Sequence, residues 1–430
     1  MRATLAALLF ACLPLLAVGQ MADDQVSSDY LSSLKVAGAN GASIALGGAL
    51  GRHSTGSVLG VDSIPNWSSN FYEPGIIDSF GDLQFNWAYT MVGHAPFGQG
   101  HSSDWDGEST FIGAPIVPVN IDLRNFDGSP RFVNGIRMYL DATQFVKPVL
   151  QSPIFSLSRY SSSGTPTQFT DALMRAEFFK KSDDDWHTYL VPRVAPARTM
   201  VLIRGTYRFA TAPDGSLLFV LVDPTTFLNE FFPPPSLTGP DNASVIGQAE
   251  SAHDITTRDI STFLFPNTFL NVGGGFLVFG FHNYDIEAGG QDNGFRERRY
   301  VLNYSSYITP GVFIGDPVLD VATLSHELSE TFNDPFVNNA TPWWLSPNGN
   351  CQNNLETGDV IEGLPNEIFP ITLHGNTYHP QNEALLQWFA DQTPSSAIHG
   401  AYSYPNENVL TSGSVPQLPG CPAPATTASN

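Results

Sequence analysis

The segment between Asp316 and Pro335 constrains the fold most, because its apolar residues recur at helical spacing. They form one stripe along a helix: Val321, Leu324, Leu328 and Phe332. Asp316 as a cap and Pro317 at the first helical position predict where the helix begins, and Asp334-Pro335 predicts where it ends. Such a helix must bury its stripe in a core, which leaves its opposite side for polar side chains.

Three ionisable residues occupy that opposite side. His326 and Glu330 are four residues apart and lie one turn above each other, with Glu327 on the flank between them. The pattern His-Glu-x-x-Glu suits a zinc-peptidase helix, in which two ligands grip the ion and the Glu beside the first acts as general base. A carboxylate as second ligand leaves the metal's identity open, with zinc expected. The alternative is a helix whose charged side is simply solvated.

The rest of the chain predicts a mixture of strands and shorter helices, so the fold class is α+β. The predicted strands include one half-buried segment and a hairpin around Pro213-Asp214-Gly215: 117–123, 200–209, 217–222, 275–284 and 299–305. Helices are predicted at 167–180 and 382–391.

The segments around the main helix carry a resemblance to a known family. In chain order they are Phe279-Gly280-Phe281-His282, the helix motif with Ser325, Asp334-Pro335, Trp343-Trp344, Leu355-Glu356-Thr357-Gly358-Asp359, and an aromatic segment from Tyr378 to Phe389. This order resembles a family of secreted metallopeptidase-like proteins that includes bacterial and fungal members and the plant phosphate-induced, Exordium-like proteins. The resemblance covers Gly275 to Phe389 and implies a zincin-like mixed β-sheet with an active-site helix. This chain departs from the pattern in having its cysteine, Cys351, before Glu356.

A metal site at this helix implies roles for the residues of the motif. His326 and Glu330 hold the metal, and Glu327 is the general base. Glu356 is the predicted third ligand, because a carboxylate from a following segment completes a three-ligand site with one position left for water. Asp359 is the alternative third ligand, or a partner that orients His326.

Other polar residues have two interpretations each. His282 is predicted to stabilise the oxyanion of a tetrahedral intermediate or to line the cleft, and the alternative is a hydrogen bond to loop backbone. The stretch from Glu356 to Asp359 has the alternative of a plain turn. His374 and His379 are alternative ligands. Asp104 to Glu108 contains too few ligands for a calcium loop and is expected to be a solvated turn.

Residues 1–19 have the layout of a secretory signal peptide: Arg2, an apolar run from Leu5 to Ala17, and small residues at the cleavage site. We therefore expect a secreted, extracellular protein. The remaining chain divides into a Gly/Ser/Asn-rich N-terminal region at 20–113, which is extended or a pro-segment, a zincin-like α+β domain at 114–421 and a disordered tail at 422–430.

Two further expectations follow from export. Once Cys12 leaves with the signal, Cys351 and Cys421 are expected to form a disulfide bond. N-glycans are expected at three sequons, namely Asn66, Asn242 and Asn303, while a fourth at Asn339 is weakened by Pro342.

The charge balance excludes some partners. With 19 basic and 41 acidic residues the net charge is −22, which repels nucleic acid and anionic membranes. The predicted function is a secreted, zinc-dependent, peptidase-like hydrolase acting on a protein or peptide. The alternative is a non-catalytic cell-wall or matrix binding protein on the same scaffold, with Trp343 and Trp344 in aromatic-rich loops. A two-carboxylate glycosidase fits poorly, because Glu327 and Glu330 share one helix.

Overall fold

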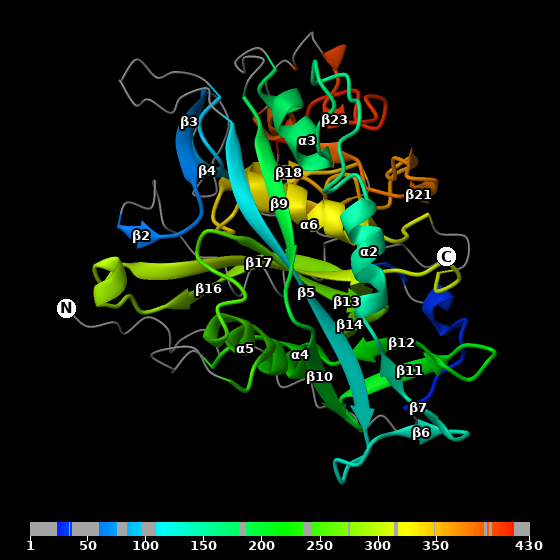
Figure 1. Cartoon of the computed structure of the whole chain (residues 1–430). Coiled ribbons are helices and arrows are strands. Elements are labelled where there is room, and N and C mark those ends of the chain that lie inside the picture. The colour runs from blue at the N-terminus through cyan, green and yellow to red at the C-terminus, as the bar shows by residue number, and fades with distance from the viewer. Residues whose placement is uncertain are drawn as a thin grey trace.

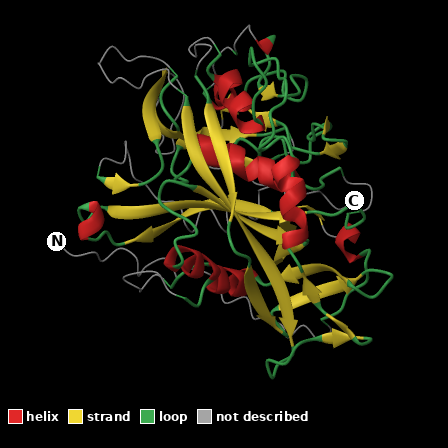
Figure 2. Cartoon of the chain, in the orientation of Figure 1, coloured by secondary structure: helices red, strands yellow, loops and turns green. Residues whose placement is uncertain are grey.

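The computed structural model describes residues 24–33, 35–36, 60–74, 84–96, 109–179, 186–234, 242–273, 276–313, 317–347, 349–390, 394 and 398–416. The predicted signal peptide, the segment 104–108, Cys421 and the predicted tail lie outside these residues. The chain is α+β, with a central, largely parallel sheet (Figures 1 and 2). No helix among the described residues is long and apolar enough to cross a membrane.

The main sheet has the strand order β10-β5-β13-β17-β16. Its strands are β5 (Thr110–Arg124), β9 (Thr188–Val194), β10 (Arg198–Ile203), β13 (Ile260–Pro266), β16 (Gly280–Glu287), β17 (Glu297–Tyr307), β2 (Val61–Asp62) and β8 (Tyr139–Leu140). β10, β13 and β9 pair parallel to β5, and β17 pairs parallel to β13. β16 runs antiparallel to β17.

Both faces of the central strand β13 are buried. Ile260 and Leu264 of β13 face the core under α6, here called the α6-side core, whereas Phe263 and Phe265 face the opposite core. The prediction of a half-buried strand at 117–123 was therefore wrong in one respect, since its polar residues are buried too. Asp122 is 1% exposed, and its ion pairs with Arg124 and Arg137 make this burial tolerable.

Helices cover the two faces. α6 (Ala322–Asn333), α3 (Phe169–Glu177) and α2 (Thr143–Gln151) contribute to the α6-side core. α4 (Pro224–Phe231) and α5 (Val245–Ser251) contribute to the opposite core, below the sheet in Figure 1. The late helix α7 (Leu386–Phe389) is shorter than predicted, because residues 383–384 form a strand instead. Two 3₁₀ turns are η1 (Tyr30–Ser33) and η2 (Gln291–Asn293).

α6 confirms the predicted stripe and C-terminal end but begins five residues later than predicted. Pro317 is not helical, and Asp320 has a positive φ of 42° just before the first turn. That backbone conformation is incompatible with a helix running through Asp320. The helix therefore begins at Ala322, after the backbone has turned.

A second sheet has the order β1-β15-β14-β12-β11. Its strands are β1 (Lys35–Val36), β11 (Tyr207–Thr211), β12 (Leu217–Val222), β14 (Thr268–Gly273) and β15 (Phe276–Val278). The predicted hairpin is β11–β12, but the predicted strand 200–209 is broken at Gly205, whose φ is +96°. The predicted strand 275–284 is likewise two strands, β15 and β16.

The described residues of the N-terminal region pack against the rest of the chain. β3 (Asn66–Pro74) and β4 (Gln84–Val92) form a hairpin, and Met91 and Val92 are buried in the α6-side core. Asp24, 2% exposed, lies 3.1 Å from both Arg131 and Arg204 and so ties the N-terminal segment to the main sheet.

The remaining strands are short and belong mostly to the C-terminal part. They are β6 (Phe132–Val133), β7 (Ile136–Arg137), β18 (Ala340–Leu345), β19 (Cys351–Asn354), β20 (Ile371–Leu373), β21 (Asn376–Tyr378), β22 (Glu383–Ala384), β23 (Ser403–Tyr404) and β24 (Val415–Pro416). Trp344 lies in β18 rather than in a loop and is 1% exposed, packed against Trp388. Cys351 is buried, and its predicted bond to Cys421 stays a prediction.

The predicted glycan sites Asn242 and Asn303 differ in their exposure to solvent. Asn242 is exposed. Asn303 is 0% exposed in the middle of β17, so this sequon cannot carry a glycan in the folded chain. The prediction failed there because a sequon says nothing about burial.

Candidate metal centre

α6 presents its ionisable side to the protein interior. Leu324 and Leu328 anchor the helix in the α6-side core. On the other side, His326 Nε2 lies 3.2 Å from Glu330 Oε1, as their spacing predicts. The Glu327 and Glu330 side chains are only 5% and 4% exposed. The alternative of a solvated helix surface is therefore wrong.

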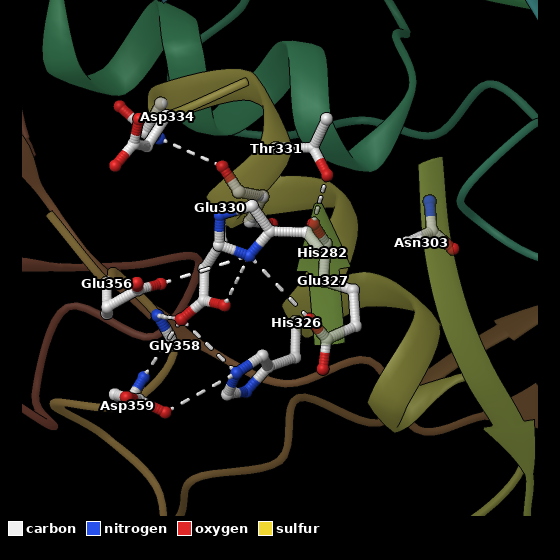
Figure 3. A network of polar contacts seen from close by, with 12 residues as sticks. His282, Asn303, His326, Glu327, Glu330, Thr331, Asp334, Glu356, Gly358 and Asp359 are labelled. Atoms are coloured by element: carbon white, nitrogen blue, oxygen red, sulfur yellow. Dashed lines mark hydrogen bonds and ion pairs between the residues drawn. The ribbon is translucent and has the colours of Figure 1, made fainter. Parts of the chain in front are cut away.

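β16 brings His282 to this side of the sheet. A Cβ on Gly280, two residues earlier, would lie 2.5 Å from Glu327 Oε1 and 2.8 Å from the Tyr304 carbonyl oxygen, so only glycine lets α6 approach so closely. His282 Nδ1 lies 3.3 Å from Glu330 Oε2, 3.8 Å from Glu327 Oε2 and 3.9 Å from Glu356 Oε2 (Figure 3). His282 thus faces a group of carboxylates rather than loop backbone.

The loop after β19 closes over the helix. The backbone N–H groups of Gly358 and Asp359 donate to Glu330 Oε1 at 3.1 and 3.4 Å. A Cβ on Gly358 would lie 2.5 Å from His326 Nδ1, which explains glycine at this position by close approach to the imidazole. Asp359 Oδ1 lies 3.7 Å from His326 Nε2. The stretch 356–359 does form a turn, and that turn contacts the helix motif directly.

Gln381 orients the imidazole of His326. Gln381 Nε2 donates to the Gly358 carbonyl oxygen at 2.8 Å, which leaves Gln381 Oε1 to accept from His326 Nδ1 at 3.2 Å. With Nδ1 as the donor, the lone pair of a neutral His326 resides on Nε2, which points toward Glu330 and Asp359. This arrangement is the one that a metal-binding histidine requires.

Burial sets the charge state of the cluster. It raises the pKa of Asp359 to about 7 and that of Glu356 well above its usual value, with the neighbouring Glu330 carboxylate as the next cause in both. Burial opposes charge on the imidazoles too, but the surrounding carboxylates raise the pKa of His282 and of His326 well above 6.5. Although burial also opposes charge on Glu330, His326 and His282 lower its pKa. Glu330 is therefore the carboxylate held in ionised form.

Among the residues that the structure describes, two groups of three side chains have ligand atoms within 4.8 Å of one another. They are His326, Glu327 and Glu330, and His282, Glu330 and Glu356. Glu330 belongs to both. Glu356, the predicted third ligand, thus lies with His282, while Asp359 is the carboxylate beyond the helix motif that lies near His326. All six predicted site residues meet in one buried cluster.

The two alternative ligands lie apart from this cluster. His374 Nε2 lies 3.3 Å from Ser156 Oγ, in the turn between β20 and β21. His379 Nδ1 lies 2.6 Å from Asp320 Oδ2, at the start of α6. Neither histidine belongs to the two groups of ligand atoms.

Three polar residues near the cluster were not anticipated as part of it. Asn303 pairs with His282 across β16 and β17 and therefore lies on the same face, under α6. Gln381 and Glu383 belong to the segment 378–389, whose resemblance to the family was the one signal that could have indicated them. Glu383 is 1% exposed, and neither of its carboxylate oxygens has a hydrogen-bond partner of normal geometry among the described residues.

No protein-family model, curated protein or solved structure matches the chain. The resemblance to the secreted metallopeptidase-like family therefore depends on the motif residues alone.

Proposed function

We propose that this protein is a secreted, metal-dependent hydrolase of zincin-like type that acts on peptides, with zinc as the expected metal. The observation that carries the proposal is the approach of His326 Nε2 to Glu330 Oε1 at 3.2 Å, with the Glu327 carboxylate buried beside them. A ligand-bearing helix packed on a mixed sheet next to its antiparallel edge strand supports the zincin-like architecture.

The distances fit a metal. Zn–N and Zn–O bonds of about 2.0–2.2 Å at tetrahedral angles put neighbouring ligand atoms roughly 3.3–3.6 Å apart. The contacts of His326 with Glu330 and Asp359, at 3.2 and 3.7 Å, bracket that value. Several buried carboxylates lie around two imidazoles, and a divalent cation supplies the positive charge that makes such burial tolerable.

In this proposal each residue of the cluster has its own role in metal binding or proton transfer. His326 and Glu330 hold the ion, Gln381 orients His326, and Asp359 is the nearest further ligand. When bound, a zinc ion acts as a Lewis acid toward a carbonyl oxygen and lowers the pKa of a coordinated water. Glu327, next to the first ligand, accepts a proton from the nucleophile as general base. His282 Nδ1 lies 3.8 Å from Glu327 Oε2, which is beyond hydrogen-bond distance.

Metal content and peptide cleavage together test the proposal. Plasma mass spectrometry of the purified protein should find tightly bound zinc that is lost in the His326→Ala/Glu330→Ala double variant. A peptide library should be cleaved by the wild type, and Glu327→Gln should retain zinc but lose cleavage by at least 100-fold. A folded protein that stays metal-free after zinc is offered would refute the proposal.

One observation favours a second candidate, a non-catalytic extracellular binding protein on the same scaffold. The site is enclosed, since even the His326 side chain is only 12% exposed. A cation there would tie α6 to the loop 356–359 without reaching a substrate. Bound zinc with no cleavage of any peptide by the wild type would favour this candidate. The burial of Trp344 removes one of the two tryptophans proposed as its binding surface.

A further inference from the structure

We propose that the cluster binds a second divalent cation through His282, Glu356 and the second carboxylate oxygen of Glu330. This inference rests on the proposed function, because it adds a cation to the one expected at His326. Glu330 would then bridge a two-metal centre.

Each carboxylate oxygen of Glu330 lies near a different imidazole. Oε1 lies 3.2 Å from His326 Nε2, and Oε2 lies 3.3 Å from His282 Nδ1 (Figure 3). The N–H groups of Gly358 and Asp359 donate to Oε1 and fix the rotation of the carboxylate, so Oε2 is directed toward β16. A carboxylate with one imidazole at each oxygen has the geometry that bridges two cations about 3.5–4 Å apart.

The second ligand set shares only Glu330 with the first. His282 comes from β16 and Glu356 from the loop after β19, and His282 Nδ1 lies 3.9 Å from Glu356 Oε2. The ligand atoms of His282, Glu330 and Glu356 all lie within 4.8 Å of one another. Asn354 Nδ2 donates to Glu356 Oε1 at 2.5 Å, which leaves Oε2 facing His282. Such an outer hydrogen bond is typical of carboxylates that bind metals.

A separate observation concerns the imidazole itself. The His282 side chain is 5% exposed and its Nε2 has no hydrogen-bond partner among the described residues, while Nδ1 faces three carboxylates. Nδ1, the nitrogen that would bind the cation, is therefore the one turned toward the carboxylates.

Zinc stoichiometry tests the inference. Chelator-treated protein is titrated with Zn²⁺ by calorimetry, and the zinc retained after gel filtration is counted by plasma mass spectrometry. We expect two zinc ions per chain in the wild type and one in His282→Gln, in Glu356→Gln and in His326→Gln. His379→Gln, which changes a histidine outside the cluster, is the matched control and should keep two.

The outcomes separate the two proposals. One zinc in the wild type that His282→Gln retains and His326→Gln loses would overturn the second site and leave the proposed function standing. No zinc in any protein would overturn both. Should a variant fail to fold, the wild type loaded with Mn²⁺ still decides: a spin-coupled pair in its paramagnetic resonance spectrum supports the bridged centre, and isolated Mn²⁺ spectra at all loadings refute it.

Discussion

Glu177, the last residue of α3, should make the stability of the chain fall as pH rises. Its side chain is buried against α7, where one carboxylate oxygen accepts the Leu386 N–H at 3.0 Å and the other, Oε2, has no hydrogen-bond partner among the described residues. Burial raises the pKa of Glu177 from 4.5 to about 8. The folded chain therefore keeps this proton over a pH range in which the unfolded chain has released it.

The magnitude follows from linkage. Between pH 4.5 and 8 the folded state binds more protons than the unfolded state, so the stability due to this group is fully present below pH 4.5 and is lost as pH rises through 8. At about 1.4 kcal/mol per pH unit, with half of Glu177 ionised at pH 8, the loss is about 4 kcal/mol. An unfolding entropy of about 0.8 kcal/mol/K for roughly 400 residues converts this to about 5 °C in Tm.

Thermal unfolding of wild type and Glu177→Gln at pH 5 and pH 8 measures this effect. Gln keeps an acceptor for the Leu386 N–H but cannot ionise, so the variant should lose about 4 °C less than the wild type between pH 5 and pH 8, since a small part of the loss already occurs below pH 5. Glu297→Gln, at a partly exposed carboxylate paired with Arg299, should change that difference little. Equal pH dependence in wild type and Glu177→Gln would refute the reasoning.

Two further predictions concern single positions. Gly358→Ala should weaken zinc binding at least 10-fold in chelator competition, because its Cβ would lie 2.5 Å from His326 Nδ1, whereas Gly164→Ala, with no atom within 4 Å, should bind zinc like the wild type. Normal affinity in Gly358→Ala would contradict the role of this close contact. In a eukaryotic host, Asn242→Gln should reduce the mass of the purified protein by one glycan, while Asn303→Gln should leave it unchanged. A glycan on Asn303 would contradict its burial.

The main helix was predictable where its own residues decide the structure. Its stripe is periodic over four positions, and Asp334-Pro335 ends it because a proline disfavours helix at the residue before it. Its start was not predictable in the same way. Asp320 is fixed at positive φ by long-range contacts, namely a bridge to Ile308 and hydrogen bonds to His379, which no local pattern contains.

The site was predictable as a list of residues but not as an arrangement. The helix motif and the stretch 356–359 identify the side chains, since their chemistry is local. The two-sided contacts of Glu330 depend on where β16 places His282, and the sheet register decides that. Asn303 was missed for the same reason. The predicted strand 299–305 contains it, but only the pairing of β16 with β17 places it beside His282.

The order of strands in the main sheet has a consequence for how the chain reaches its fold. β5 ends at Arg124, but its parallel partner β13 begins only at Ile260, far along the chain. β17, which ends at Tyr307, then pairs with β13. Parallel pairings of this kind require long loops to close before any contact offsets the lost entropy. Until β9, β10 and β13 have been made, the apolar run in β5 has no parallel partner, and unpaired strands of this type aggregate readily. The yield of folded protein should therefore depend on what keeps β5 apart from other copies while the rest of the chain is made.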